Sequence, residues 1–330
     1  MGILQAAPVQ ALVDAKAICC WCGEPLRRAK QLNQWTPWWC FTKTCYDRQC
    51  AWSVTAEKKG RPTEWLFCPV PKQVEFFEEA YRLGRLALED PERGSGRVLF
   101  GGAAGPGKSH ALRWGLYRDA MRIPDLNCLL LRRTFKELDA THLREMMREV
   151  PRLGGRYLTA DKRAVWPNGS VIQAGHCETD TDAGNHLSTE YDREVFDELV
   201  TFAMEPALEI MSRARTAKDA VKAAGGAQVW AGSNPGGRGA LWVKAFFVDK
   251  SVDPAQFPRY QPDRYSYIHA KLEDNPYMDP AYRQTLEEMP ALRRRQLLEG
   301  DWNAFEGQFF DWLPMKDDQP WHIHDIGVTP

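Results

Sequence analysis

The pattern of hydrophobic and polar positions along the chain predicts an α/β protein with a mainly parallel sheet. Several apolar runs lack the alternation of a half-exposed strand and are typical of strands buried on both faces; they cover 97–100, 127–131 and 228–232. Around these runs, apolar spacing and helix-forming residues predict helices over 74–88, 110–121 and 134–150. Strands that alternate with helices favour a doubly wound sheet with helices on both faces.

Three other segments carry weaker patterns. Residues 164–172 predict a hairpin that turns at an Asn-Gly pair. Residues 53–64 are polar and contain Gly and Pro, which predicts a linker. A strand ending in Val195 and Phe196 is weak, because the residues before it are mostly charged.

Residues 102–109 read GAAGPGKS, which matches the phosphate-loop pattern of Gly, four residues, Gly, Lys and Ser or Thr. The loop follows a predicted strand and precedes a predicted helix, as the motif requires. Its glycines let backbone N–H groups close around phosphates, and the helix N-terminus adds a positive dipole. Lys108 is expected to neutralise the β/γ-phosphate oxygens and Ser109 to ligate Mg²⁺. The predicted ATP site comprises Gly102, Gly105, Gly107, Lys108, Ser109 and His110.

Two carboxylates follow the weak strand. At its tip, Asp197 is expected to hold the Mg²⁺ shell, and Glu198 is expected to orient and deprotonate the attacking water. On its own this pair is typical of a solvated surface. The phosphate loop favours the catalytic interpretation, because nucleotide hydrolysis needs such a pair and no other apolar run ends in Asp-Glu.

Other polar residues have two interpretations each. Ser233 and Asn234 follow a predicted strand, so they are either a sensor of the γ-phosphate or a plain turn before Pro235. Arg213 and Arg215 are either an arginine finger for a neighbouring subunit or a solvated helix end. Gln73 is either a helix cap or a group that reads adenine.

Cysteines are concentrated near the N-terminus. Two close pairs separated by a loop fit a tetrahedral Zn²⁺ site, and the alternative is a set of partly buried thiols. The predicted structural zinc ligands are Cys19, Cys22, Cys40 and Cys45, with Cys50 as a substitute.

The overall composition excludes few classes of protein. The net charge of −1 gives no global attraction to nucleic acid, so DNA contacts would depend on local basic patches. No run approaches the length of a membrane-spanning helix, and the N-terminus lacks the pattern of a signal peptide. We therefore expect a cytoplasmic protein without a membrane partner.

The order of these motifs resembles that of the large terminase subunit of tailed bacteriophages, the motor that packages DNA. The similarity covers roughly residues 69–310 and includes GGAAGPGKS, LLLRRTFKEL, VFDEL, SNPGGRGALWVKAFF and the segment from Leu272. The resemblance implies a P-loop NTPase of the ASCE, RecA-like type with a C-terminal helical lid. It also implies that Gln73 contacts adenine.

The cysteine spacing and this resemblance together predict a division of the chain into four parts. They are an N-terminal zinc module (1–60), a P-loop ATPase core (61–250), a helical lid (251–310) and a linker (311–330). The family usually continues into an RNase H-like nuclease, but Asp325 alone cannot build a two-metal site. We therefore expect no nuclease activity here, and we expect that the sequence is part of a longer protein.

The expected function is ATP-driven translocation of double-stranded DNA into a procapsid in the host cytoplasm. The resemblance implies three protein partners: the portal, the small terminase subunit, and further copies of the chain in a ring. Two alternatives stay open, namely another P-loop DNA translocase or helicase, and a nucleotide-gated binding module that uses the zinc knuckle.

Overall fold

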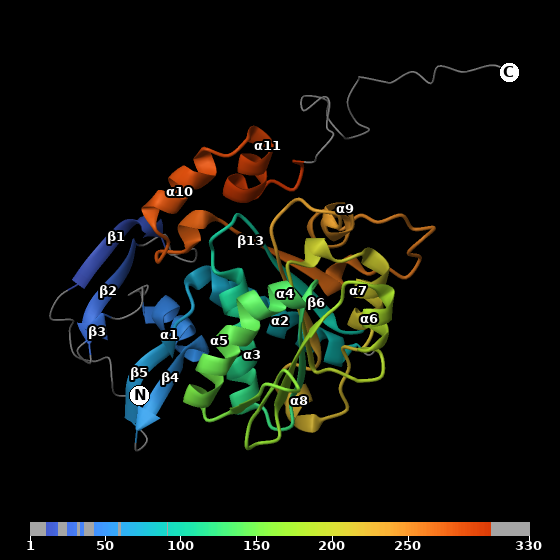
Figure 1. The fold of residues 1–330 in the computed structure, drawn as a ribbon, viewed down its shortest axis with the longest axis horizontal. Helices are drawn as coiled ribbons and strands as arrows, with labels where there is room; N and C mark the ends of the chain where they lie inside the picture. Colours follow the sequence, from blue (N-terminus) through green and yellow to red (C-terminus); the bar gives the residue numbers. More distant parts are fainter. Residues whose placement is uncertain are drawn as a thin grey trace.

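Long parallel strands form the centre of the molecule (Figure 1). The computed structural model describes residues 11–18, 25–31, 34–35, 43–58, 61–90 and 92–304. Its main sheet has the strand order β13-β6-β12-β11-β7-β10-β9-β8. The strands are β6 (Gly96–Gly102), β7 (Asn127–Arg132), β8 (Arg156–Leu158), β9 (Arg163–Val165), β10 (Val171–His176), β11 (Arg193–Asp197), β12 (Gln228–Ser233) and β13 (Tyr265–Ala270).

Six neighbouring strands of this sheet, from β13 to β10, are parallel, and β9 and β8 add an antiparallel edge. The three predicted apolar runs form β6, β7 and β12, and the predicted hairpin is β9–β10. The α/β fold with a mainly parallel sheet is therefore confirmed.

Helices cover both faces of the sheet. Figure 1 shows α3 and α5 on one side and α6 and α7 on the other, and each side has its own cluster of buried apolar residues. The α-helices of this region are α2 (Pro71–Glu89), α3 (Lys108–Arg122), α4 (Phe135–Leu138), α5 (Arg144–Glu149), α6 (Asp180–Gly184), α7 (Met204–Met211), α8 (Asp219–Ala223) and α9 (Ala240–Val243). Shorter 3₁₀ turns are η2 (Val150–Leu153), η3 (Leu199–Thr201), η5 (Pro262–Arg264) and η6 (Leu272–Asp274), and π-helical turns are η1 (Asp139–Leu143), η4 (Lys244–Val248) and η7 (Arg295–Glu299).

Strand β11 is buried along its whole length, although its sequence predicted a weak strand. Its first residue, Arg193, is 0% exposed because its guanidinium donates to the Asp119 carboxylate of α3 (2.9 Å) and to the carbonyl of Gly226 (2.5 Å). A buried charge is tolerated when it is paired and hydrogen-bonded in this way. The charged start of the strand is therefore part of the core.

The predicted linker at 53–64 is wrong, because most of this segment forms a hairpin. Strands β4 (Val54–Lys58) and β5 (Arg61–Phe67) pair antiparallel, and the ring of Phe67 stacks on Trp114 of α3 at 5.5 Å. Helix α1 (Lys43–Trp52) precedes the hairpin, and Trp52 stacks on Phe77 of α2 at 4.9 Å. The described N-terminal part also contains a sheet of β1 (Ala11–Ile18), β2 (Pro25–Gln31) and β3 (Gln34–Trp35).

The predicted lid boundary at 251 also needs correction, because β13 lies within that range and pairs with β6 in the main sheet. The helical part of the predicted lid follows β13 and comprises α10 (Pro280–Glu287), α11 (Ala291–Arg294) and η7. It lies against the phosphate loop: Ala104 N–H donates to Leu297 O (2.6 Å), and Asn275 Nδ2 donates to Gly105 O (2.7 Å). Among the described residues, no helix has the length and apolarity to span a bilayer.

Candidate nucleotide site

The predicted motifs meet at the carboxyl edge of the sheet. The phosphate loop follows β6. Asp197 ends β11 and Glu198 follows it, and Ser233 ends β12 and Asn234 follows it. Parallel strands place their carboxyl ends together, and this edge is where open α/β sheets bind ligands. Since β12 lies between β6 and β11, the sensor residues separate the loop from the carboxylates.

The phosphate loop has the backbone that its glycines allow. Gly102, Gly105 and Gly107 have φ of 125°, 92° and 79°, which L side chains rarely adopt. A Cβ on Gly107 would lie 2.8 Å from Gln73 Nε2, so the end of the Gln73 side chain would have to shift to make room for it. Helix α3 begins at Lys108, and its first N–H groups have no intrahelical acceptor. The loop and the helix start therefore form a cradle suited to an anion.

Lys108 and Ser109 point to opposite parts of this cradle. The Lys108 ammonium donates to Ala103 O at 2.6 Å, and burial lowers the pKa of Lys108 to about 8 although Glu198 and Asp197 act in the opposite direction. The Ser109 hydroxyl donates to Asp197 Oδ1 at 2.9 Å. The hydroxyl and the carboxylate predicted to share a Mg²⁺ ion are thus in direct contact.

Asp197 is almost fully buried and has two further partners, which the sequence did not indicate. His142 Nε2 lies 2.9 Å and Arg132 Nε lies 3.4 Å from its Oδ2. Burial acts to raise the pKa of Asp197, but His142, Arg132 and Ser109 together hold it below its usual value. His142 comes from the π-helical turn η1, and no motif in the sequence marks that turn. The site thus keeps Asp197 ionised.

Glu198 has a strained backbone, with φ of 59° and ψ of 57°. Non-glycine residues in this left-handed region are uncommon and often belong to functional sites. Burial and the neighbouring Asp197 raise the pKa of Glu198, while Lys108 acts to lower it. A carboxylate with a raised pKa is a stronger base, as proton abstraction from water requires.

Ser233 and Asn234 link the elements around the site. The Asn234 side chain donates to Gly102 O at 2.9 Å, at the start of the phosphate loop. The Ser233 hydroxyl accepts from Val200 N–H at 3.2 Å, directly after the two carboxylates. These contacts tie the β12 tip to both halves of the site, and the sensor role stays a prediction.

A cavity of about 380 Å³ lies beside the phosphate loop, lined among others by Phe67, Gln73, Gly107, His110 and Tyr277. Gln73 Oε1 accepts from Val70 N–H (3.0 Å), and its Nε2 donates to Gly107 O (3.2 Å). Gln73 therefore caps α2 and also contacts the phosphate loop. The cavity has the size and aromatic lining of a base pocket, and the adenine contact of Gln73 stays a prediction.

Arg213 and Arg215 lie far from the phosphate loop of their own chain. Ala214 between them forms a bridge with Tyr191, just before β11, so both lie at the amino edge of the sheet. Arg215 Nε pairs with Glu190 at 2.8 Å. A role as an arginine finger for a neighbouring subunit stays a prediction.

Most predicted zinc ligands lie outside the described residues, namely Cys19, Cys22 and Cys40. Cys45 and Cys50 both lie on α1. Within the described ranges, no cluster of three or more His, Cys, Asp or Glu side chains is arranged to hold a metal ion. The zinc site stays a prediction.

Comparison with known proteins gives matches among solved structures only. No protein-family model and no curated protein matches the chain. Among solved structures, the chain is similar to the large terminase of a thermophilic bacteriophage in complex with ADP, with 16% identity over 71% of this chain and 53% of that chain and a TM-score of 0.52. A second crystal form of that terminase gives 13% identity over 72% and 54%, with a TM-score of 0.51.

The chain shares the fold of the matched part of a phage large terminase. At this identity the likeness shows the fold alone, an α/β arrangement with a mainly parallel sheet. The chain spans about half the length of the phage terminase that it matches.

Proposed function

We propose that this chain binds and hydrolyses ATP with Mg²⁺ as the ATPase part of a viral DNA-packaging motor. The observation that supports this most is the contact between Ser109 and Asp197, with Glu198 next in the chain and Lys108 beside them. One backbone arrangement thus supplies a phosphate cradle, a cation-binding pair and a base.

The residues present fit Mg²⁺-ATP. ATP with Mg²⁺ supplies the phosphoanhydride bond and charge neutralisation. Lys108 would exchange its bond to Ala103 O for the β/γ-phosphate oxygens, and Ser109 and Asp197 would hold the cation. Glu198 would orient a water molecule and take its proton. The cavity beside Gln73 would hold the adenine base.

Hydrolysis is coupled to motion through β12. Asn234 bonds the start of the phosphate loop, and Ser233 bonds the backbone after Glu198, so loss of the γ-phosphate changes both contacts together. Lid contacts at Ala104 and Gly105 carry that change to α10 and η7. Movement of the lid against the core is the proposed power stroke.

The proposal for the load and the partners is supported by the order of the motifs and by the fold shared with a large terminase. We propose double-stranded DNA as the load, a ring of copies on the portal as the assembly, the small terminase subunit as a partner, and the host cytoplasm as the place. Contacts with the phosphate backbone would make DNA binding fall steeply with salt.

Substitution of Glu198 tests the proposal. Removing a general base lowers rates by about 10²–10⁴-fold, so Glu198→Gln is expected to lower Mg²⁺-dependent ATP hydrolysis by that factor without loss of nucleotide binding. Glu190→Gln is the matched control, because Glu190 is 57% exposed and lies at the opposite edge of the sheet. Phosphate release with and without DNA is the measurement.

Two outcomes would contradict parts of the proposal. If no Mg²⁺-dependent hydrolysis occurs even with DNA and portal, and Glu198→Gln changes nothing, the chain is a nucleotide-gated binding module. If the chain separates DNA strands without procapsids, it is a helicase and not a packaging motor.

A further inference from the structure

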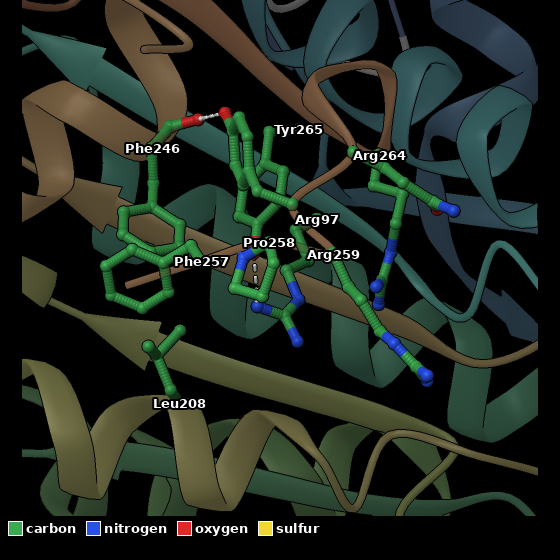
Figure 2. A pocket seen from close by; sticks show the side chains of 10 residues that line it. Arg97, Leu208, Phe246, Phe257, Pro258, Arg259, Arg264 and Tyr265 are labelled. Carbon is green, nitrogen blue, oxygen red and sulfur yellow. Dashed lines mark hydrogen bonds between the residues drawn. The ribbon is translucent and has the colours of Figure 1, made fainter. Parts of the chain in front are cut away.

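A second cavity of about 380 Å³ lies at the amino edge of the sheet, where β6 and β13 begin. Figure 2 shows three arginine side chains, Arg97, Arg259 and Arg264, gathered at this cavity beside a wall of aromatic rings. We call it the amino-edge cavity. It lies at the end of the strands opposite the phosphate loop, so its occupant would not touch the nucleotide.

The arginines of this cavity lack acidic partners. Arg97 is 8% exposed, its Nη1 donates to the Tyr265 hydroxyl at 2.6 Å, and its Nε has no hydrogen-bond partner. Arg264 Nε and Gln261 Oε1 are also buried without a partner. Among the described residues, no carboxylate forms an ion pair with Arg97, Arg259 or Arg264. Of the three, Arg97 is buried and Arg264 is partly buried, and a buried guanidinium nitrogen without a partner is costly and calls for an anion.

Nearby acids do not neutralise this charge. Both carboxyl oxygens of Glu194 are buried without a partner, and burial raises the pKa of Glu194 well above its usual value although Arg97 and Arg213 act against this. Asp263 pairs with Arg93 at 2.6 Å. The amino-edge cavity therefore carries a net positive charge.

The remaining wall is apolar and aromatic. Phe246 packs edge to face on Phe257 at 5.0 Å, and Tyr260 lies 5.0 Å from Tyr265. The Tyr260 hydroxyl donates to Phe246 O at 2.6 Å, so its polar group is already used. The occupant must therefore combine carboxylates or similar anions with apolar or aromatic groups.

The chain itself contains such a segment just beyond the described residues. Residues 309–318 read FFDWLPMKDD, with three aromatic residues and three aspartates; we call them the acidic-aromatic segment. The description ends at Ala304, on the same side of the sheet as the cavity: Trp302 Nε1 donates to the Tyr267 hydroxyl at 3.0 Å, and Tyr267 and Tyr265 share one face of β13. Five extended residues span about 17 Å. Tyr265, two residues along β13 from the Trp302 partner Tyr267, lines the cavity.

We propose that the acidic-aromatic segment of the same chain docks in the amino-edge cavity, with its aspartates on the arginines and its aromatic rings against the aromatic wall. This goes beyond the proposed ATPase and does not depend on it. Nucleic acid is the less favoured occupant, because a duplex cannot enter a cavity of this volume and only Arg259 of the three arginines lies on the exposed rim.

Photo-crosslinking in the full chain tests the docking. Benzoylphenylalanine replaces Pro258, which lines the cavity and is exposed, and the matched control carries it at Arg148, which is 71% exposed on α5. We expect position 258 to crosslink residues 309–318 within one chain, about tenfold more than position 148 does, because tethering makes docking intramolecular. Peptide mapping by mass spectrometry identifies the crosslinks.

Charge substitutions then separate specific docking from chance proximity. Two variants are expected to lower the crosslink yield about tenfold, since each removes charge-assisted bonds. One is the triple variant Asp311→Asn, Asp317→Asn and Asp318→Asn, and the other is Arg259→Gln alone. Asp325→Asn is the matched control and should leave the yield unchanged. Each protein is first checked for a single cooperative thermal unfolding transition.

Three results would overturn the proposal. The first is a crosslink yield at 258 that equals the yield at 148. The second is a crosslink that forms only between two chains. The third is a short DNA duplex that crosslinks to position 258 and displaces the segment, which would make the cavity a nucleic-acid site.

Discussion

The two edges of the central sheet differ in how their charged groups are paired. At the carboxyl edge, Lys108, Ser109 and Asp197 each have a hydrogen-bond partner at 2.6–2.9 Å, so other protein groups hold these side chains in place. At the amino edge, Arg97 and Arg264 keep buried nitrogens without partners. A site whose side chains are already held in place loses less conformational entropy when a ligand binds. A site with unpaired buried polar groups gains its missing hydrogen bonds only from an occupant.

The amino edge also contains a fully paired arginine, which gives an internal reference. Arg193 begins β11 and bonds Asp119 and the carbonyls of Asp192 and Gly226. Arg97 begins β6 only two strands away and has one side-chain bond, to Tyr265. We therefore infer that Arg193, which is fully paired, stabilises the fold, whereas Arg97 is available to a ligand.

The largest expected effect follows from breaking the paired arginine. Removing one partner of a buried ion pair costs about 3–5 kcal/mol, because the other charge stays buried. We expect Arg193→Met to lower the free energy of unfolding by this amount, measured by urea denaturation. Arg97→Met is the matched control and should cost less than about 1.5 kcal/mol, since it leaves no carboxylate unpaired. Equal losses would contradict the comparison.

Much of the carboxyl edge could be predicted from the sequence, because its residues lie in short motifs. The phosphate loop and the pair Asp197-Glu198 depend on local spacing, and both lie where the motifs require. His142 was missed because it reaches Asp197 from a π-helical turn 55 residues away, and nothing in its neighbourhood signals that contact.

The other wrong predictions concern elements whose place depends on contacts between residues distant in the sequence. The sequence predicted β11 as a weak strand because Asp119, the partner of Arg193, lies in α3 and is distant in the sequence. The sequence assigned β13 to the lid because only its pairing with β6 places it in the main sheet. The amino-edge cavity draws residues from β6 and from a loop more than 150 residues later, so no sequence motif could mark it.

A smaller effect is expected from pH at the carboxyl edge. The pKa of Lys108 is about 8, and only the protonated ammonium attracts phosphates. Its charged fraction falls about tenfold between pH 7 and pH 9, so ATP affinity should weaken by about that factor. Calorimetric titration at pH 7, 8 and 9 measures this. Lys108→Arg keeps its charge throughout, and an equal slope in that variant would mean that another group titrates.

Gln73 tests whether a preorganised residue has a second role. Gln73→Ala removes the cap of α2 and should lower the free energy of unfolding by about 1 kcal/mol. If the amide also reads adenine, ATP affinity falls about tenfold, whereas affinity for tripolyphosphate stays nearly unchanged. Equal losses for both ligands would leave Gln73 as a cap and a loop contact only.

The smallest expected effect concerns the arginines at the amino edge that have no ion pair among the described residues. Arg259 is exposed and has no ion pair among the described residues, so Arg259→Gln removes no contact that holds the fold. Surface changes of this kind alter the free energy of unfolding by less than about 0.5 kcal/mol. Urea denaturation of this variant is compared with that of Arg193→Met, both in a chain that also carries Asp311→Asn, Asp317→Asn and Asp318→Asn, so that docking of the acidic-aromatic segment does not contribute. A loss above about 1 kcal/mol would show that the guanidinium stabilises the fold, and the distinction between paired and unpaired arginines at this edge would then fail.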